Sequence, residues 1–236
     1  MKFNRIATDK KLTASMLIGL GIMAAPLSAS ALSIDINTYV TGSTVSGNAT
    51  VATLTLTQNG SNVDFSFVNS VNNLSGGIGD DAFISQLLFS YGGATALSGA
   101  SFSNFGGTQS IVASDFDINP PGKNAGYDFY LELDFPTKAS QRFLDGEVTT
   151  WTISNVQIND FIGSVSGSGP SSLAMVHVQQ VGAGSGGSNS VKYVGSAETG
   201  NPPAELPQNS VPEPATLALM GVGLLGLGAQ RKRKSS

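Results

Sequence analysis

The sequence predicts an all-β fold, an antiparallel β-sandwich or jelly-roll-like domain that lies between two terminal targeting segments. Hydrophobic residues recur at every second position over 127–135, as in a strand with one buried face. Residues 52–57 and 63–68 alternate in the same way, and Asn59-Gly60 between them favours a tight hairpin turn with two positive φ angles. Glycine-rich breaks separate such segments, which is typical of sandwiches with many short strands.

Further strands are expected where short apolar segments lie between glycine, proline or asparagine turns. They cover residues 33–40, 83–91, 110–118, 148–158, 172–181 and 191–194. The apolar positions change parity after Ile153, which predicts a β-bulge near Ser154-Asn155. Residues 137–144 are expected to hold a helical turn, and the glycine-rich stretch 182–190 a flexible loop or a hairpin tip.

The N-terminus has the features of a secretory signal peptide. Four cations precede an apolar stretch, 12–25, and an A-x-A site follows with Ala29 and Ala31 at its small positions. Residues 1–31 are therefore expected to be removed after Ala31, with the Sec machinery and signal peptidase as partners.

Composition restricts the classes of partner. The chain has no cysteine, which excludes disulfides, thiol catalysis and Cys-ligated metals. Between residues 32 and 210, four Lys/Arg face fourteen Asp/Glu, a net charge of −10. So acidic a segment argues against nucleic acid as a partner and repels anionic polysaccharide unless cations intervene.

The mature region divides into a passenger domain, a linker and a terminal signal. Residues 32–195 are long enough for one domain with a hydrophobic core. Residues 196–210 are polar and contain prolines, as in an extended linker.

The last segment, 211–236, has three parts. Val211, Pro212, Glu213 and Pro214 open it, and the two prolines keep the backbone extended. The apolar stretch 215–229 would span roughly 22 Å as a helix, less than the ~30 Å hydrocarbon core of a bilayer, so it would make only a marginal transmembrane anchor. The segment ends in four cations, Arg231, Lys232, Arg233 and Lys234. Such a basic cluster is expected to keep this end on the cytoplasmic side of the membrane.

This tripartite end resembles the PEP-CTERM sorting signal of Gram-negative bacteria, and the resemblance covers the last 26 residues. It implies processing by an exosortase at the inner membrane, near Pro212–Pro214, and export associated with exopolysaccharide and biofilm. An ordinary C-terminal tail anchor is the alternative. The stretch 172–182 also resembles an AxHVQ-type segment near the end of many PEP-CTERM passenger domains, which assigns no activity to its histidine.

Acidic residues allow a structural calcium ion as a cofactor. Asp115 and Asp117 open a D-x-D-x-N sequence, but the sixth position is Pro120 and the twelfth Gly126, unlike an EF-hand loop. Asp80 and Asp81 form a second pair after a glycine-rich turn. The other interpretation is a solvated strand edge and a turn-capping pair.

No enzymatic activity is expected. His177 is the chain's single histidine, and no G-x-S-x-G sequence surrounds a serine, so no catalytic triad is indicated. A structural histidine is the favoured interpretation. No catalytic residue and no organic cofactor are assigned.

Two surface features suggest ligands. An aromatic platform for sugars could come from Tyr91, Tyr127, Tyr130, Tyr193 and Trp151. Tyr130, which lies among Asp128, Glu132 and Asp134, is the most suggestive of these, whereas Trp151 shares parity with Ile153 and is expected in the core. Thr53, Thr55 and Thr57 share one strand face, as in ice-binding proteins, although one strand alone makes no ladder and β propensity explains it equally.

The expected function is a secreted, non-enzymatic surface or matrix protein sorted by an exosortase. A secreted carbohydrate-binding or carbohydrate-active module is the alternative, and an ice-binding protein the remote one.

Overall fold

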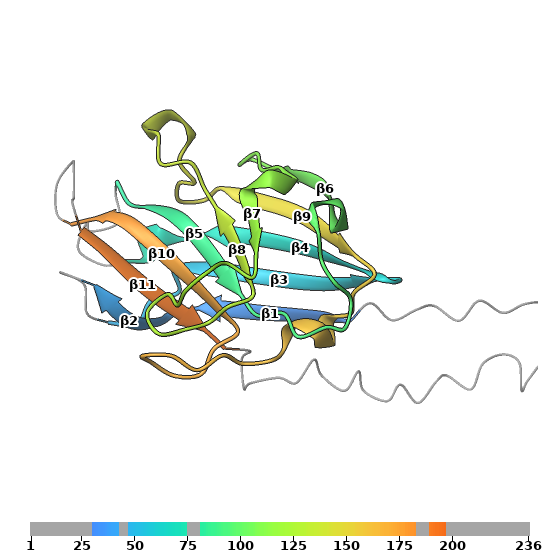
Figure 1. The fold of residues 1–236 in the computed structure, drawn as a ribbon. Coiled ribbons are helices and arrows are strands. Elements are labelled where there is room, and N and C mark those ends of the chain that lie inside the picture. The colour runs from blue at the N-terminus through green and yellow to red at the C-terminus, as the bar shows by residue number, and fades with distance from the viewer. Residues whose placement is uncertain (1–29, 43–46, 75–80, 183–188, 197–236) are drawn as a thin grey trace, which may run out of the picture.

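The computed structural model describes residues 30–42, 47–74, 81–182 and 189–196, which form two stacked antiparallel sheets (Figure 1). The five-stranded sheet has the strand order β1-β3-β4-β9-β6, and the six-stranded sheet the order β2-β11-β10-β5-β8-β7. The all-β sandwich predicted from the sequence is therefore confirmed. The strands are β1 (Ala31–Ile36), β2 (Thr38–Gly42), β3 (Ala52–Asn59), β4 (Asn62–Asn69), β5 (Phe83–Phe89), β6 (Phe102–Gly107), β7 (Phe116–Ile118), β8 (Leu131–Asp134), β9 (Val148–Ser154), β10 (Ala174–Val181) and β11 (Asn189–Gly195).

The main core lies between the two sheets and is rich in aromatic rings. Phe65 of β4 stacks on Trp151 of β9, with ring centroids 5.0 Å apart, and lies 5.8 Å from Phe89 of the opposite sheet. Trp151 is 1% exposed, as the sequence predicts. Burial of these large rings is the main stabilising contribution that the sandwich receives.

The hairpin between β3 and β4 is confirmed, but its turn lies one residue later than expected. Asn59 pairs with Asn62, so Gly60 and Ser61 form the two-residue turn. Among the turn residues only Gly60 has a positive φ, +61°. Glycine at the first central position with one positive φ is the pattern of a type II′ turn, which matches the twist of the flanking strands.

The predicted strand 33–40 is in fact two strands that belong to different sheets. The chain leaves β1 at Asn37, whose backbone N–H donates to the Val194 carbonyl at 3.2 Å. It then enters β2, which pairs with β11, whereas β1 pairs with β3. One continuous stretch therefore forms an edge strand of each layer.

Residues 110–118 are not one strand, which corrects the expectation. They contain a 3₁₀ turn, Ala113–Asp115, and only the short β7. The preceding β6 has no hydrophobic alternation and includes Gly106 and Gly107, so the sequence gives no strand signal there. Backbone pairing with β9 makes it a strand.

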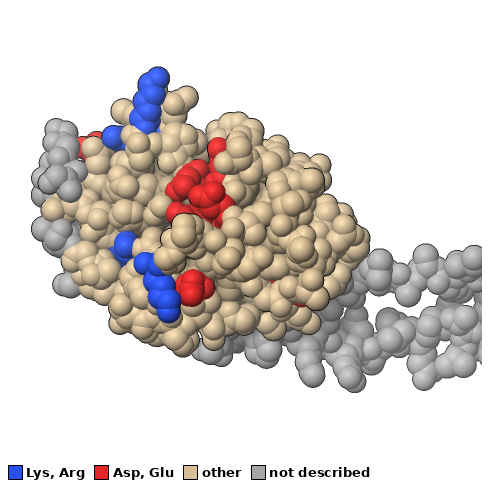
Figure 2. Space-filling model, viewed as in Figure 1, with Lys and Arg blue, Asp and Glu red and all other residues tan. Residues whose placement is uncertain are grey.

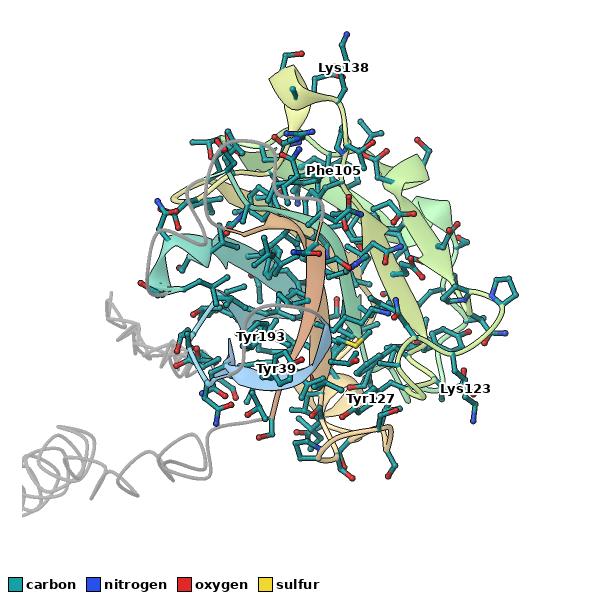
Figure 3. The ribbon with its side chains drawn as sticks, turned by 90° about the vertical axis from the view of Figure 1, so that its left-hand side faces the viewer. Tyr39, Phe105, Lys123, Tyr127, Lys138 and Tyr193 are labelled. Carbon is teal, nitrogen blue, oxygen red and sulfur yellow. The ribbon has the colours of Figure 1, made fainter. Side chains whose placement is uncertain are left out.

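The alternating segment 127–135 is a strand only from Leu131 onward. Leu131 and Leu133 face the main core, but Tyr127 and Phe129 belong to a second cluster on the outer face of the six-stranded sheet. This cluster includes Leu88, Met175 and Val194. In Figure 3, Tyr127 lies against the fold and Lys123 of the same loop projects away from it. The loop therefore covers part of that face.

The change of parity after Ile153 is not a bulge. β9 ends at Ser154, and Asn155 has a φ of +60°, which turns the chain into a 3₁₀ turn over Ile158–Phe161. A register shift occurs instead in β10, where Gln180 has a φ of +56°. The helical turn expected within 137–144 is a 3₁₀ turn over Ala139–Gln141. Two further 3₁₀ turns cover Val71–Asn73 and Gly99–Ser101.

Candidate functional site

The two targeting signals lie almost wholly outside the described residues. Ala29 lies outside the described residues, as does the whole segment 211–236 with its processing motif, apolar stretch and basic cluster. Within the described part of the chain, no helix has the length and hydrophobicity that crossing a membrane requires.

The expected signal-peptidase site adjoins a paired strand. Ala31 is the first residue of β1 and pairs with Thr57, and the Gln58 N–H donates to the Ser30 carbonyl at 2.8 Å. Cleavage after Ala31 would leave Leu32 as the N-terminus and keep the rest of β1 paired. Cleavage at this position stays a prediction.

An acidic cluster lies on the outer face of the six-stranded sheet. Asp117 of β7 is paired with Glu132 of β8, and Asp134 follows two residues later on the same face. Figure 2 shows acidic side chains gathered over β7 and β8. The Gln86 amide donates to both the Glu132 and the Asp134 carboxylates. One amide group thus bridges two neighbouring carboxylates on the same face of the sheet.

Glu132 is the most perturbed carboxyl of this cluster. Partial burial raises its pKa, the charges of Asp134 and Asp117 raise it further, and the hydrogen bond from Gln86 opposes them. Because a raised carboxyl pKa favours the protonated form, the ionised side chain destabilises the folded state at neutral pH. Stability contributed by protonated Glu132 is present below its unfolded pKa, about 4.3, and is lost as pH rises through the folded value.

Replacing Glu132 by glutamine is therefore expected to stabilise the protein at pH 7. The urea midpoint of Glu132→Gln should exceed that of the wild type at pH 7, and the difference should close as the pH falls below about 4.3. Asp128→Asn is the matched control, because Asp128 is an exposed carboxylate without a hydrogen-bond partner among the described residues. A Glu132→Gln midpoint at or below the wild-type value at pH 7 would contradict the assignment.

Of the four residues named for calcium, the three that the structure describes do not form a common site. Asp115 accepts a hydrogen bond from the Val112 N–H at 2.8 Å and caps a 3₁₀ turn, the alternative that the sequence left open for it. Asp117 faces solvent on β7, Asp81 is exposed, and Asp80 lies outside the described residues. No group of three potential metal ligands occurs within the described ranges. Calcium binding at these positions stays a prediction.

His177 lies on the outer face of β10. It is paired with Gln86 of β5 on one side and with Lys192 of β11 on the other. Burial, and then the charge of Lys192, lower the pKa of its imidazole, which favours the neutral ring. Within the described chain no serine hydroxyl or carboxylate bonds to the ring. The Lys192 ammonium donates instead to the Asn124 side chain.

The aromatic residues considered as sugar contacts are mostly buried. Tyr127 and Tyr193 are fully buried, and Tyr91 is 9% exposed. Tyr193 packs edge-on against Tyr39, its neighbour in Figure 3, with ring centroids 5.9 Å apart. Tyr130 is half-buried, and its ring centroid lies 5.5 Å from that of Tyr91. These rings form no exposed stacking platform within the described surface.

The three threonines of β3 lie on the outer face of the five-stranded sheet, as predicted. The Thr53 hydroxyl donates to Asp35 of the neighbouring β1 at 2.9 Å. Thr55 is paired with Ser33 on one side and Ser66 on the other, so hydroxyl groups continue across adjacent strands. Ice binding requires such continuity, but the carboxylates of Asp35 and Asp64 interrupt the pattern, and ice binding stays a prediction.

A shallow groove of about 430 Å³ opens on this same face. It runs across β3, β4, β9 and β6, and eight of its ten lining residues have polar side chains. We call it the hydroxyl groove; it is lined by Thr55, Thr57, Asn59, Asp64, Phe65, Ser66, Asn104, Thr150, Trp151 and Thr152. Phe65 and Trp151 are 2% and 1% exposed, so their rings fill the core rather than the groove.

The sequence identifies only two of the groove's side chains in advance, Thr55 and Thr57. Asp64 and Ser66 occupy the expected outward positions of β4, but alternation alone cannot show that Thr150 lies beside Ser66. Asn104 lies in β6, which has no strand signal. The register of strand pairing would have been needed to find the site.

Comparison with known proteins identifies the C-terminal segment. Residues 210–234 match the family model of the PEP-CTERM protein-sorting motif. No curated protein and no solved structure shows significant similarity to the chain. The fold of the passenger domain is thus known only from its own structure, whereas the C-terminal tail is recognised by its motif. The chain therefore carries a PEP-CTERM sorting motif at residues 210–234, a signal that implies export and processing by an exosortase at the membrane.

Proposed function

We propose that the chain is a non-enzymatic surface or matrix protein associated with exopolysaccharide. Its apolar stretch 215–229 holds it briefly in the inner membrane, and the exosortase cuts near Pro212–Pro214. The β-sandwich then passes to the envelope or the extracellular matrix. The observation that carries this proposal is the sorting motif at residues 210–234.

The chemistry of the passenger domain supports a non-enzymatic role. Burial and the charge of Lys192 lower the pKa of His177, so both oppose the proton uptake that a general base must perform. The Asp115 carboxylate caps a turn, and those of Glu132 and Asp134 accept hydrogen bonds from the Gln86 amide, so each already has a partner within the fold.

The proposal is tested by fractionating a Gram-negative host that encodes an exosortase and expresses the full chain. We expect the protein in the surface or exopolysaccharide fraction, and no new reducing ends in that polysaccharide after incubation with the purified protein. Retention in the periplasm would contradict the surface role. New reducing ends would contradict the non-enzymatic role and favour the carbohydrate-active alternative.

A carbohydrate-binding role is the second candidate, and the hydroxyl groove is the observation that favours it. Binding and structural roles are compatible, because a matrix protein must contact the polymer around it.

A further inference from the structure

We propose that the hydroxyl groove is a binding site for a neutral polysaccharide chain. The inference deepens the proposed function, since it supplies the contact between the passenger domain and its matrix. It rests on the strands β3, β4 and β9, which bring uncharged hydroxyl groups into register on one open face.

The groove is built from two rows of polar side chains that run across the strands. The first row is Thr55, Ser66 and Thr150; Ser33 continues it beyond the groove on one side, and it ends opposite Gly106 on the other. The second row is Thr57, Asp64 and Thr152, and Ser103 continues it beyond the groove. Neighbouring strands lie about 4.8 Å apart, and the rows are separated by about 7 Å, the distance between alternate residues of a strand. Hydroxyl groups therefore repeat along a path perpendicular to the strands.

Four hydroxyls of the groove lining are free to bind a ligand. Those of Thr55, Thr57, Ser66 and Thr150 have no hydrogen-bond partner among the described residues, and all four side chains are half-buried. Each hydroxyl can donate one hydrogen bond and accept two. Sugar hydroxyls have the same capacity, so the two surfaces can exchange hydrogen bonds in both directions.

The one charged group of the groove is held in place by its neighbours. Asp64 accepts hydrogen bonds from the Thr152 hydroxyl at 2.6 Å and from the Asn59 amide at 2.9 Å. The Asn104 amide in turn donates to the Thr152 hydroxyl at 3.2 Å. A carboxylate can accept about four hydrogen bonds. Asp64 therefore keeps capacity for a ligand hydroxyl in a fixed geometry.

The β6 side of the groove is kept open by its backbone. The register between β6 and β9 shifts between Ser103 and Gly106, and Asn104 has a φ of +53°. A Cβ atom on Gly106 would lie 2.9 Å from the Thr150 hydroxyl oxygen. Glycine at this position leaves the space beside the Thr150 hydroxyl empty, and a side chain would close it.

Charge decides which class of polymer fits. The groove lining contains Asp64 and no lysine or arginine. An anionic polymer would be repelled by this carboxylate without any compensating cation, whereas a neutral polyol would not. Because the groove lacks an exposed aromatic ring, binding depends on hydrogen bonds. Single sugars should bind weakly, and long chains that engage many copies of the protein should bind more tightly.

The test uses the processed protein isolated from the exosortase-bearing host and native gels that contain a dissolved polymer. Dextran and galactomannan are the neutral probes, and alginate is the anionic probe. The double variant Thr55→Val, Thr150→Val removes two free hydroxyls with little change of shape. Thr41→Val is the matched control, because Thr41 is an exposed threonine on β2 of the other sheet.

We expect retardation of the wild-type protein by at least one neutral polymer and none by alginate. The double variant should bind that polymer about tenfold more weakly, since two net hydrogen bonds are lost. Gly106→Ala should weaken binding by filling the groove, and Thr41→Val should bind like the wild type. Circular dichroism establishes that each variant is folded.

Three outcomes would overturn the inference: no retardation by either neutral polymer, retardation by alginate alone, or equal retardation of the wild type and the double variant. Each would leave the proposed function intact if the protein still reaches the surface fraction. A protein absent from that fraction would refute the proposed function, whatever the gels show.

Discussion

A triple variant in which Pro212, Glu213 and Pro214 are alanine is expected to abolish exosortase processing. Proline fixes φ and has no backbone N–H, whereas alanine favours helix, so the variant changes both the side chains and the backbone preference of the motif that the exosortase is proposed to recognise. Mass spectrometry of the C-terminal peptide should find residues 231–236 still attached in the variant and absent from wild-type surface protein. The variant should accumulate in the inner membrane.

The linker offers a matched control for this experiment. Pro202, Pro203 and Glu205 are the same residue types a few positions upstream, and changing them to alanine should leave processing unchanged. An intact 231–236 peptide on wild-type surface protein would contradict the sorting mechanism, as would normal processing of the triple variant.

The substitution Trp151→Ala is expected to destabilise the passenger domain by about 3–5 kcal/mol, a large part of the stability of a typical domain. The indole stacks on Phe65 and contacts Phe89 and Phe116, whose ring centroids lie 6.1 Å and 5.5 Å from its own. Its removal leaves a cavity between the sheets. Urea unfolding should be followed by circular dichroism, because Trp151 is the chain's single tryptophan.

Two further variants separate packing from polarity. Trp151→Phe should cost much less than Trp151→Ala, since the indole N–H has no hydrogen-bond partner in the described structure and none is lost. Thr150→Val, the next residue but on the outer face, should change stability by less than about 0.5 kcal/mol. Equal losses for Trp151→Ala and Thr150→Val would show that the aromatic cluster is not the main core.

The sequence predicts correctly those parts of the fold in which several local signals, such as hydrophobic alternation and turn residues, indicate the same structure. The hairpin of β3 and β4 combines alternation in both strands with a glycine turn, and it was found correctly. Trp151 was placed in the core because it shares parity with Ile153. In both cases the information lies within a few residues of sequence.

Other parts depend on contacts between distant segments. β6 is a strand because β9 pairs with it, and nothing in its own composition indicates this. Alternation marks Tyr127 and Phe129 as buried, but it cannot reveal that they cover the outer face of a sheet. The hydroxyl groove likewise requires the register of β3, β4 and β9, which only the folded chain provides.

The division of one segment between the two sheets at Asn37 has a consequence for folding kinetics. β2, near the start of the domain, pairs among the described strands only with β11, its last strand, so the six-stranded sheet needs a contact between the two ends of the domain. Contacts between the ends of a chain carry a large loop-closure entropy and slow folding. The six-stranded sheet therefore cannot be completed until residues 189–195 are available for pairing, whereas every strand of the five-stranded sheet ends by Ser154.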